Sequence, residues 1–368
     1  MYNKNIVFLL ASLVVIASCR KNDQIPNNTQ PIPVTNGFYL LNQGNMNQNN
    51  ASLDYFDYAS SVYARNIFKA ANPNTDVLGD TGNDMAIYGS KLYVIMNGSN
   101  KLEIADAITA KRIKVVTIPN VRNITFHKNK AYVSAYGNTL NASSANGVVI
   151  EMDTATLSTT RTIEVGRQPE GLAIVGDQLY VANSGGYDAK NYERTVTVIN
   201  LNSFTKIKNI DVAINLDKIK KDKENNLYVS NRGNYNNIVP KLYFIDTKQN
   251  IVKDSFNIPV SNMTIAGDSV YIIGTVYKPV TFEAVHSFNI INTKTRKAEG
   301  AGFITDGTEK NIQSPYGVAV DPVTRNIMVT DARDYQSSGN VIIYNAAGKK
   351  LQTYTTGLLP LSIVFTTK

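Results

Sequence analysis

Reactive side chains are scarce in this sequence, which contains one cysteine, Cys19, and two histidines, His127 and His286. Cys19 follows an N-terminal apolar segment, so the chain beyond it has no thiol. That excludes a disulfide, a thiolate metal site and a cysteine nucleophile. Two histidines far apart do not supply a zinc site, and no spacing suggests a nucleophile–His–acid triad or a Gly-rich phosphate loop. We therefore expect no catalytic residue, no cofactor and no resident metal.

Charge is also sparse, because only 18% of the residues are charged and the formal net charge is +8. The basic residues are scattered rather than gathered in a stripe, so we expect no nucleic-acid partner. The densest charged stretch, Asp217–Glu224, interleaves both signs, and we interpret it as a solvated surface. Tryptophan is absent and long amphipathic helical runs are missing, whereas Tyr, Asn, Gly, Ser and Thr are frequent. This composition is typical of a β-rich protein.

The N-terminus has the features of a bacterial lipoprotein leader. Lys4 precedes an apolar run, Ile6–Ile16, which is too short to span a bilayer and which ends just before Ala17, Ser18 and Cys19. We expect residues 1–18 to be a signal peptide and Cys19 to be lipidated, so that acyl chains anchor the protein to the outer membrane, on its outer face. The polar, Pro-containing residues 19–36 predict a flexible tether. The alternative is an ordinary secretory leader with an incidental cysteine.

A short turn recurs seven times along the chain. In each copy an Asp or Asn ends an apolar run and begins a polar turn, and the copies are spaced 46 to 53 residues apart. A repeat of this length that carries only strand signals predicts an all-β fold, a seven-bladed β-propeller of four-stranded blades over residues 37–368. The turn residues are Asp57, Asp106, Asp153, Asn200, Asp246, Asn292 and Asn345.

The order of the strands predicts how the ring closes. If the strands of a blade are lettered a to d from the axis outward, the first repeat begins at strand b with Phe38 and has no strand a before it. The last segment, Leu361–Thr367, has the pattern of strand a and nothing after it. We therefore expect the C-terminal strand to complete the first blade and to remove an open sheet edge.

Several segments resemble a known family. PEGLAIVGDQLYVANSG (169–185) and SPYGVAVDPVTRNIMVTDARD (314–334) resemble the YVTN-type, surface-layer or YncE-like propellers. GFYLLNQGNMNQNNASLDYFD (37–57) resembles more narrowly the surface lipoproteins of Bacteroidetes within that family. Some members of this group resemble cobalamin-capture proteins that sit on a TonB-dependent outer-membrane transporter. The resemblance thus implies a surface lipoprotein with cobalamin as a candidate ligand and such a transporter as a candidate partner.

The loops between strands b and c are long, polar and rich in tyrosine, whereas most other turns are tight. Long loops on a rigid scaffold commonly carry function, and Tyr with Asn, Ser and Gly is typical of recognition without a reactive group. The tyrosines could surround a large flat ligand, or they could pack the loops against one another. The loop residues that we select are Tyr136, Tyr187, Tyr192, Tyr235, Tyr277 and Tyr335, with Arg232 and Arg333, which follow strand b at the same offset.

A second set of candidates lies where strand d connects to the next strand a, at the same end of the ring. Arg122, Glu170 and Tyr316 belong to it, and Arg122 and Glu170 could pair across blades or contact a ligand. The carboxylates Asp84, Glu170 and Asp217 would be the ligands of a Ca²⁺-dependent hydrolase or lactonase. The leading hypothesis is a monomeric nutrient-binding lipoprotein without enzymatic activity. The alternatives are an adhesion propeller that binds glycan or protein, and that hydrolase.

Overall fold

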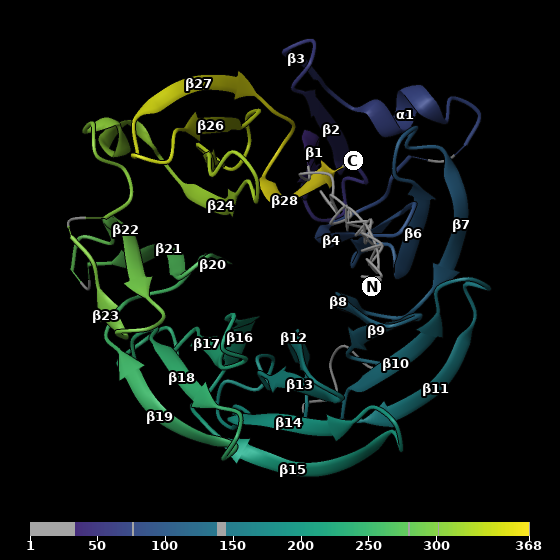
Figure 1. Cartoon of the computed structure of the whole chain (residues 1–368), viewed down its shortest axis with the longest axis vertical. Coiled ribbons are helices and arrows are strands. Elements are labelled where there is room, and N and C mark those ends of the chain that lie inside the picture. Colours follow the sequence, from purple (N-terminus) through teal and green to yellow (C-terminus); the bar gives the residue numbers. More distant parts are fainter. Residues whose placement is uncertain (1–33, 76, 138–144, 279, 301, 368) are drawn as a thin grey trace, which may run out of the picture. The chain divides into compact units, whose positions relative to one another are not determined.

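The computed structural model describes residues 34–75, 77–137, 145–278, 280–300 and 302–367. The expected signal peptide, Cys19 and most of the expected tether lie outside the described residues. Within them, the strands form seven four-stranded antiparallel sheets, which are the blades of a ring around a central axis (Figure 1). This confirms the predicted all-β, seven-bladed propeller. A five-residue helix, α1 (Ile67–Ala71), and a 3₁₀ helix, η1 (Thr308–Asn311), complete the described secondary structure, and no helix there is long and apolar enough to cross a membrane.

Strand a of each blade lies innermost, and residues from all seven of these strands line a central channel with a cavity of about 140 Å³. The last strand of the chain takes this place in blade 1. In order from blade 1 to blade 7, strand a is β28 (Pro360–Thr367), β4 (Gly82–Tyr88), β8 (Val121–His127), β12 (Pro169–Val175), β16 (Leu216–Lys221), β20 (Asn262–Ala266) and β24 (Pro315–Val320).

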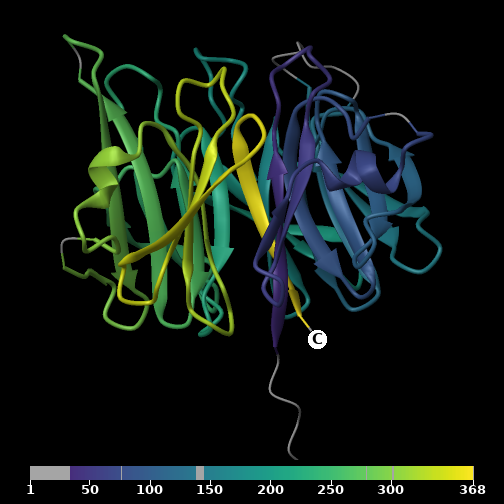
Figure 2. The same ribbon diagram turned by 90° about the horizontal axis from the view of Figure 1, so that it is seen from above.

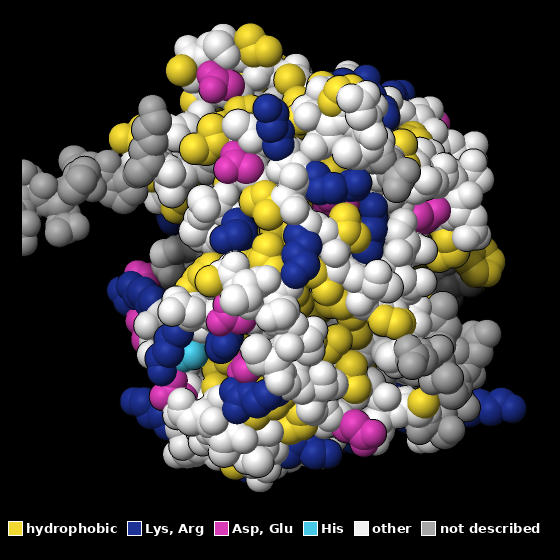
Figure 3. All heavy atoms as spheres, turned by 90° about the vertical axis from the view of Figure 1, so that its right-hand side faces the viewer, with side chains coloured by type: hydrophobic (Ala, Val, Ile, Leu, Met, Phe, Trp, Pro, Cys, Tyr) yellow, Lys and Arg dark blue, Asp and Glu magenta, His cyan; other side chains and the backbone are white. Residues whose placement is uncertain are grey.

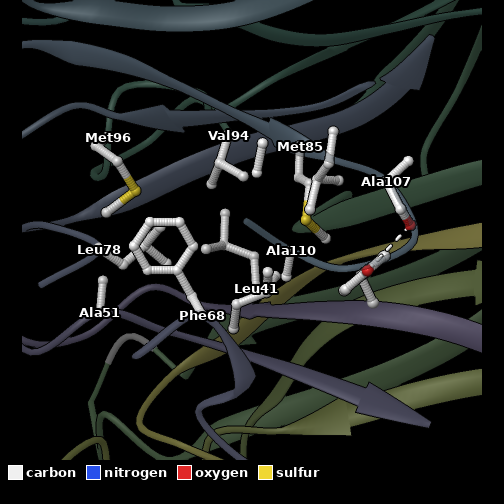
Figure 4. Close-up of a cluster of buried hydrophobic side chains, with 13 residues drawn as sticks. Leu41, Ala51, Phe68, Leu78, Met85, Val94, Met96, Ala107 and Ala110 are labelled. Atoms are coloured by element: carbon white, nitrogen blue, oxygen red, sulfur yellow. Dashed lines mark hydrogen bonds between the residues drawn. The ribbon is translucent and has the colours of Figure 1, made fainter. Parts of the chain in front are cut away.

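Strand b is the most deeply buried strand, because both of its faces pack against neighbouring blades. Such strands are nearly continuous apolar runs rather than alternating ones. Leu41, Met85, Val94 and Phe68 show this packing between blades 1 and 2, where α1 also contributes its one buried side chain (Figure 4). Strand b is β1 (Thr35–Asn42), β5 (Lys91–Met96), β9 (Lys130–Ala135), β13 (Gln178–Asn183), β17 (Leu227–Asn231), β21 (Ser269–Tyr277) and β25 (Ile327–Asp331).

Strand c leads into the recurring Asp or Asn turns. The Asp106 carboxylate ends its strand and accepts backbone N–H bonds from Ile108 (3.1 Å) and Thr109 (2.8 Å), which stabilises the turn to strand d. Asn345 comes directly after its strand, and its side-chain oxygen accepts backbone N–H bonds from Ala347 and Lys349. Strand c is β2 (Ser52–Asp57), β6 (Lys101–Asp106), β10 (Val148–Asp153), β14 (Thr195–Asn200), β18 (Leu242–Asp246), β22 (Ala284–Asn292) and β26 (Asn340–Tyr344).

Strand d forms the outer edge of each blade, where unpaired backbone groups invite pairing with another chain. Charged side chains on these strands oppose such pairing. Figure 3 shows Lys and Arg side chains dispersed among Asp and Glu on the side of the ring that carries β7 and β11. Strand d is β3 (Val62–Ala64), β7 (Arg112–Thr117), β11 (Thr159–Glu164), β15 (Thr205–Asp211), β19 (Ile251–Phe256), β23 (Lys297–Ala298) and β27 (Lys350–Thr355).

The ring closes as predicted, because β28 pairs with β1 and completes blade 1. Phe38 and Phe365 are register partners in this ladder, and their rings lie 6.2 Å apart. The buried Asp321 of blade 7 accepts hydrogen bonds from the hydroxyls of Thr35 (2.9 Å) and Tyr58 (2.8 Å). Blade 1 is therefore stabilised both by its ladder with β28 and by hydrogen bonds to blade 7. The fold begins at Thr35, two residues before the expected boundary.

The two ends of the ring differ. The b–c loops and the d–a connections share one end, where backbone bonds join them, for example from Gly185 N–H to Arg167 C=O (3.0 Å) and from Arg232 N–H to Asn215 C=O (2.9 Å). We call this end the loop face. The a–b and c–d turns form the opposite end, the turn face, at which β1 begins and the C-terminus lies (Figure 2). This is the arrangement that the sequence predicts.

Candidate functional site

A buried network of charges lies where the channel opens onto the loop face. Its centre is Glu170, which belongs to β12 of blade 4 and is 2% exposed. The Glu170 carboxylate accepts two bonds from the Arg122 guanidinium of blade 3 (3.0 and 3.2 Å) and one from the Tyr136 hydroxyl. We call Arg122, Tyr136, Glu170, Asp217 and Arg232 the mouth network. The cross-blade pairing of Arg122 with Glu170, one of the two possibilities that the sequence left open, is the one present.

Arg232 extends the mouth network to blade 5. Its guanidinium donates to Glu170 Oε1 (3.2 Å) and to Asp217 Oδ1 (2.8 Å). Two buried carboxylates are thereby paired with two partly exposed arginines, and these pairs link three consecutive blades. Buried charges of this kind are tolerated because each finds an opposite charge with directed hydrogen bonds. Both carboxylates are already occupied by arginine, so the network fixes the geometry of the channel mouth.

The electrostatics of Glu170 follow from this pairing. Burial alone raises the pKa of a carboxyl, but Arg122 and Arg232 outweigh burial and lower the pKa of Glu170 from an ordinary value of 4.5 to about 2. For the arginines, burial opposes the charged form, and the facing carboxylates again outweigh it and raise the pKa of each. Burial, with Glu170 adding to it, raises the pKa of Tyr136 well above its ordinary value.

The lowered pKa of Glu170 predicts an acid-sensitive fold. Its ionised form contributes stability in full above the unfolded pKa near 4.5, and this contribution is lost as the pH falls through the folded pKa of about 2. We expect the free energy of unfolding in urea to decline across this window and the Glu170→Gln variant to decline less. Glu164→Gln, at an exposed position of β11, is the matched control. A Glu170→Gln profile parallel to wild type would contradict this assignment.

Tyr136 and Tyr187 show how the mouth network supports the surface above it. Tyr136 is 5% exposed, and the Arg122 guanidinium lies over its ring at 5.1 Å. Tyr187, from the b–c loop of blade 4, contacts the Tyr136 ring edge to face at 5.7 Å and is itself 58% exposed. Of this pair, Tyr187 is therefore the residue open to a ligand, while Tyr136 holds it in place.

Other b–c loop tyrosines are exposed on the same face. Tyr235 of blade 5 is 76% exposed and Tyr277, which ends β21 of blade 6, is 60% exposed. Tyr192 is partly buried; burial, followed by the neighbouring Tyr235, raises its pKa. The structure thus shows some loop tyrosines packed against their neighbours and others exposed to solvent.

Blade 7 contributes a further exposed loop. Tyr335 is 46% exposed and contacts the partly buried Tyr316 edge to face at 6.1 Å. The Tyr316 hydroxyl donates to the Gln43 side chain of blade 1. Burial, followed by Tyr335, raises the pKa of Tyr316 to about 12. Arg333 is exposed, in contrast to Arg232, so the shared offset of these two arginines does not give them a shared environment.

The three carboxylates of the Ca²⁺ alternative do not form one cluster. Glu170 and Asp217 are paired with arginines, and Asp84 accepts backbone N–H bonds from Met85 (2.9 Å) and Ile124 (3.1 Å). In the described parts of the chain, no group of three or more His, Cys, Asp or Glu residues is placed to hold a metal ion. The side chains at the mouth offer arginine, tyrosine and amide groups for recognition instead.

The charge pattern alone misplaced two residues of the channel. It took Asp217–Glu224 for a solvated surface, but Leu216–Lys221 is β16, the innermost strand of blade 5. Lys218 and Lys220 line the central channel, so that interpretation was wrong for these two lysines. The repeat carries the correct signal, since residues 218–224 have the pattern of strand a, and strand a lies nearest the axis.

Comparisons with known proteins agree with the fold. A hydrazine synthase from Kuenenia stuttgartiensis gives a TM-score of 0.58 at 18% identity, with 72% of this chain and 76% of that chain covered. A quinonprotein alcohol dehydrogenase-like protein from Bacteroides thetaiotaomicron gives 0.60 at 14% identity, covering 91% and 79%. The Pan2 WD40 domain from Neurospora crassa gives 0.53 at 10% identity, covering 77% and 80%. At these identities the likeness shows the fold alone.

The match at the level of family covers nearly all of the propeller. No curated protein sequence matches the chain significantly. A family model described as Domain of unknown function (DUF5074) matches residues 36–364. This range begins within β1 and ends within β28, so it includes all seven blades and the closing strand. The chain therefore belongs to the DUF5074 family.

Proposed function

We propose that this protein binds a ligand at the loop face and carries out no reaction there. The observation that carries the proposal is a set of exposed tyrosines at one end of the ring, one from each of blades 4 to 7. Such tyrosines give a large contact area at a low cost in conformational entropy, because each has few rotatable bonds. They are Tyr187, Tyr235, Tyr277 and Tyr335, which are 58%, 76%, 60% and 46% exposed.

The backbone of these loops forms defined turns. Tyr235 and Tyr335 have φ angles of 58° and 63°, and Arg333 has a φ of 52°. This left-handed conformation also occurs in the turns of the opposite face, for example at Ala110 and Leu157. The loop of blade 7 is held by Asp334, whose carboxylate accepts backbone N–H bonds from Gln336 (3.0 Å) and Ser337 (2.7 Å).

The hairpin of blade 6 favours a macromolecular partner at the same face. β21 and β22 have nine residues each, so the strands of this hairpin are longer than those of the b–c hairpins in the other blades. Val280 and Phe282 at its tip are 88% and 76% exposed. Exposed apolar side chains that cluster are typical of surfaces covered by another protein. A TonB-dependent transporter is the partner that the sequence resemblance implies.

The candidate ligand and the cellular location of the protein are proposed from the sequence alone. The resemblance to cobalamin-capture lipoproteins makes cobalamin the best candidate, and its large, polar-rimmed macrocycle suits a ring of tyrosines. A protein anchored at the outer membrane through Cys19 would enter the propeller at Thr35, on the turn face.

Calorimetry with cyanocobalamin on the purified protein tests this proposal. We expect saturable binding in wild type. Changing both Tyr187 and Tyr235 to alanine should weaken the affinity about tenfold or more, because each substitution removes an aromatic ring that the bound ligand would cover. Ile108→Ala, at an 89% exposed position after Asp106 on the turn face, is the control and should bind as wild type does. Absence of heat in wild type, or equal affinity in the tyrosine variant, would refute the proposal.

A further inference from the structure

The central channel contains a cation that breaks the pattern of the repeat. Lys220 of β16 pairs in register with Tyr228 of strand b. In the other six blades the residue in register with the same position of strand b is small or β-branched and uncharged. These residues are Ala86, Thr125, Ala173, Thr264, Ala319 and Val364.

This exception has a distinct environment. Ile219 lies between Lys218 and Lys220 in β16 and packs into the core with 3% exposure, whereas Lys220 is exposed to the channel. No ion pair or side-chain hydrogen bond joins Lys220 to another residue in the described ranges. The other six blades show that the fold does not require a lysine here, and positions that depart from a local rule are often functional.

The channel lining is positively biased around this lysine. Its charged members are Lys218, Lys220 and Asp84, so two cations face one anion. Both Asp84 oxygens already accept backbone N–H bonds from Met85 and Ile124, and Lys218 lies 3.6 Å from Asp217. Lys220 is therefore the ammonium group with free hydrogen-bonding capacity. Loss of hydration within the narrow channel lowers the pKa of Lys220, and the Asp84 charge opposes that shift.

The cavity suits a small ligand. It measures about 140 Å³, which is several times the space of one water molecule, and its lining is mainly polar. Asn123, on β8 of blade 3, is an amide of this lining. An ammonium group and nearby amide donors in a confined site are the groups that hold oxygen anions.

We propose that the central channel binds a small oxyanion, such as phosphate, sulfate or a short carboxylate, through Lys220 with Lys218 assisting. The site is separate from the tyrosines of the loop face and does not depend on their ligand. It lies on the axial side of the mouth network, whose arginines are already paired with Glu170 and Asp217. The positive charge available to an anion is thus mainly that of Lys220, since Lys218 also lies near Asp217.

Titration calorimetry of the full-length protein in chloride buffer tests the site with phosphate, sulfate and acetate in turn. We expect saturable binding of at least one, and the comparison among them separates tetrahedral oxyanions from carboxylates. Lys220→Thr should weaken this binding about tenfold or more, the loss expected for one charge-assisted hydrogen bond. Threonine occupies the equivalent position in blades 3 and 6, so this variant introduces a side chain that the fold already accepts there.

Two further variants make the result specific. Lys221→Thr removes the same charge from the neighbouring residue of β16, which does not line the cavity, and should bind as wild type does. Asp84→Asn removes the one anion of the lining and should strengthen binding. The bound anion should also raise the melting temperature of wild type and Lys221→Thr but not of Lys220→Thr. No saturable binding of any of the three anions, or equal losses in both lysine variants, would overturn the proposal.

Discussion

Deleting residues 358–368 abolishes cooperative folding, because this segment contains the strand that closes the ring. β28 supplies strand a of blade 1, and its side chains Ile363 and Phe365 pack beside Phe38 in the core between blades 1 and 7. The Thr330 hydroxyl of blade 7 donates to Pro360 C=O (2.6 Å). Without β28, blade 1 presents an unpaired inner edge and its neighbours lose a packed face, which exposes apolar surface and a free strand edge.

Urea unfolding followed by circular dichroism measures this loss. The truncated chain should show no sigmoidal transition, whereas wild type should unfold cooperatively. A shorter deletion, of residues 367–368, removes only the terminal register pair, Thr35 with Thr367, and should retain a transition close to that of wild type. If the protein lacking residues 358–368 unfolds at the same midpoint as wild type, closure by the C-terminal strand is wrong.

Replacing Glu170 with alanine destabilises the protein by about 3–5 kcal/mol, the cost of leaving buried charges without their partner. The change leaves the Arg122 guanidinium and one N–H donor of Arg232 without their carboxylate acceptor. It also removes the acceptor of the Tyr136 hydroxyl. Three consecutive blades lose a shared contact at the channel mouth. We expect the free energy of unfolding in urea to fall by this amount at neutral pH.

A matched variant separates this effect from the loss of any glutamate. Glu164→Ala lies at an exposed position at the end of β11, six residues earlier in the sequence. It should change the free energy of unfolding by no more than about 0.5 kcal/mol, as is usual for surface substitutions. A loss of less than about 1 kcal/mol for Glu170→Ala would mean that the mouth network contributes little to stability.

The strands and turns could be predicted because their signals are local. Asp106 and Asn200 end an apolar run and bind the backbone two and three residues on, so a few neighbouring residues specify the turn. The closing strand was predictable because Leu361–Thr367 has the strand pattern and no partner in its own repeat. Period and turn chemistry together identify the architecture.

The environment of the channel mouth could not be predicted in the same way. Glu170 contacts Arg122 and Arg232, which lie 48 and 62 residues away in the sequence and belong to different blades. Arg232 and Arg333 follow strand b at the same offset, yet one is paired in the mouth network and the other is exposed. Neighbours across blades decide burial here, and a single repeat carries no information about them.

The lysines of β16 illustrate a different limit. A stretch that mixes Lys with Asp and Glu is usually a solvated surface, and composition alone favours that interpretation. Lys218 and Lys220 line the central channel instead, because β16 is the innermost strand of its blade and lies beside the axis. The loop tyrosines show the same limit, since Tyr136 and Tyr187 are both loop residues and only Tyr187 is exposed.

Hydrogen–deuterium exchange with and without cyanocobalamin tests the central claim, ligand binding at the loop face, most directly. The account predicts slower exchange in the b–c loops of blades 4, 5 and 7, over residues 183–195, 231–240 and 331–340, where Tyr187, Tyr235 and Tyr335 lie. The turns after Asp106, Asp153 and Asn200 on the opposite face should exchange unchanged. Protection confined to those turns, or no protection anywhere at saturating ligand, would contradict it.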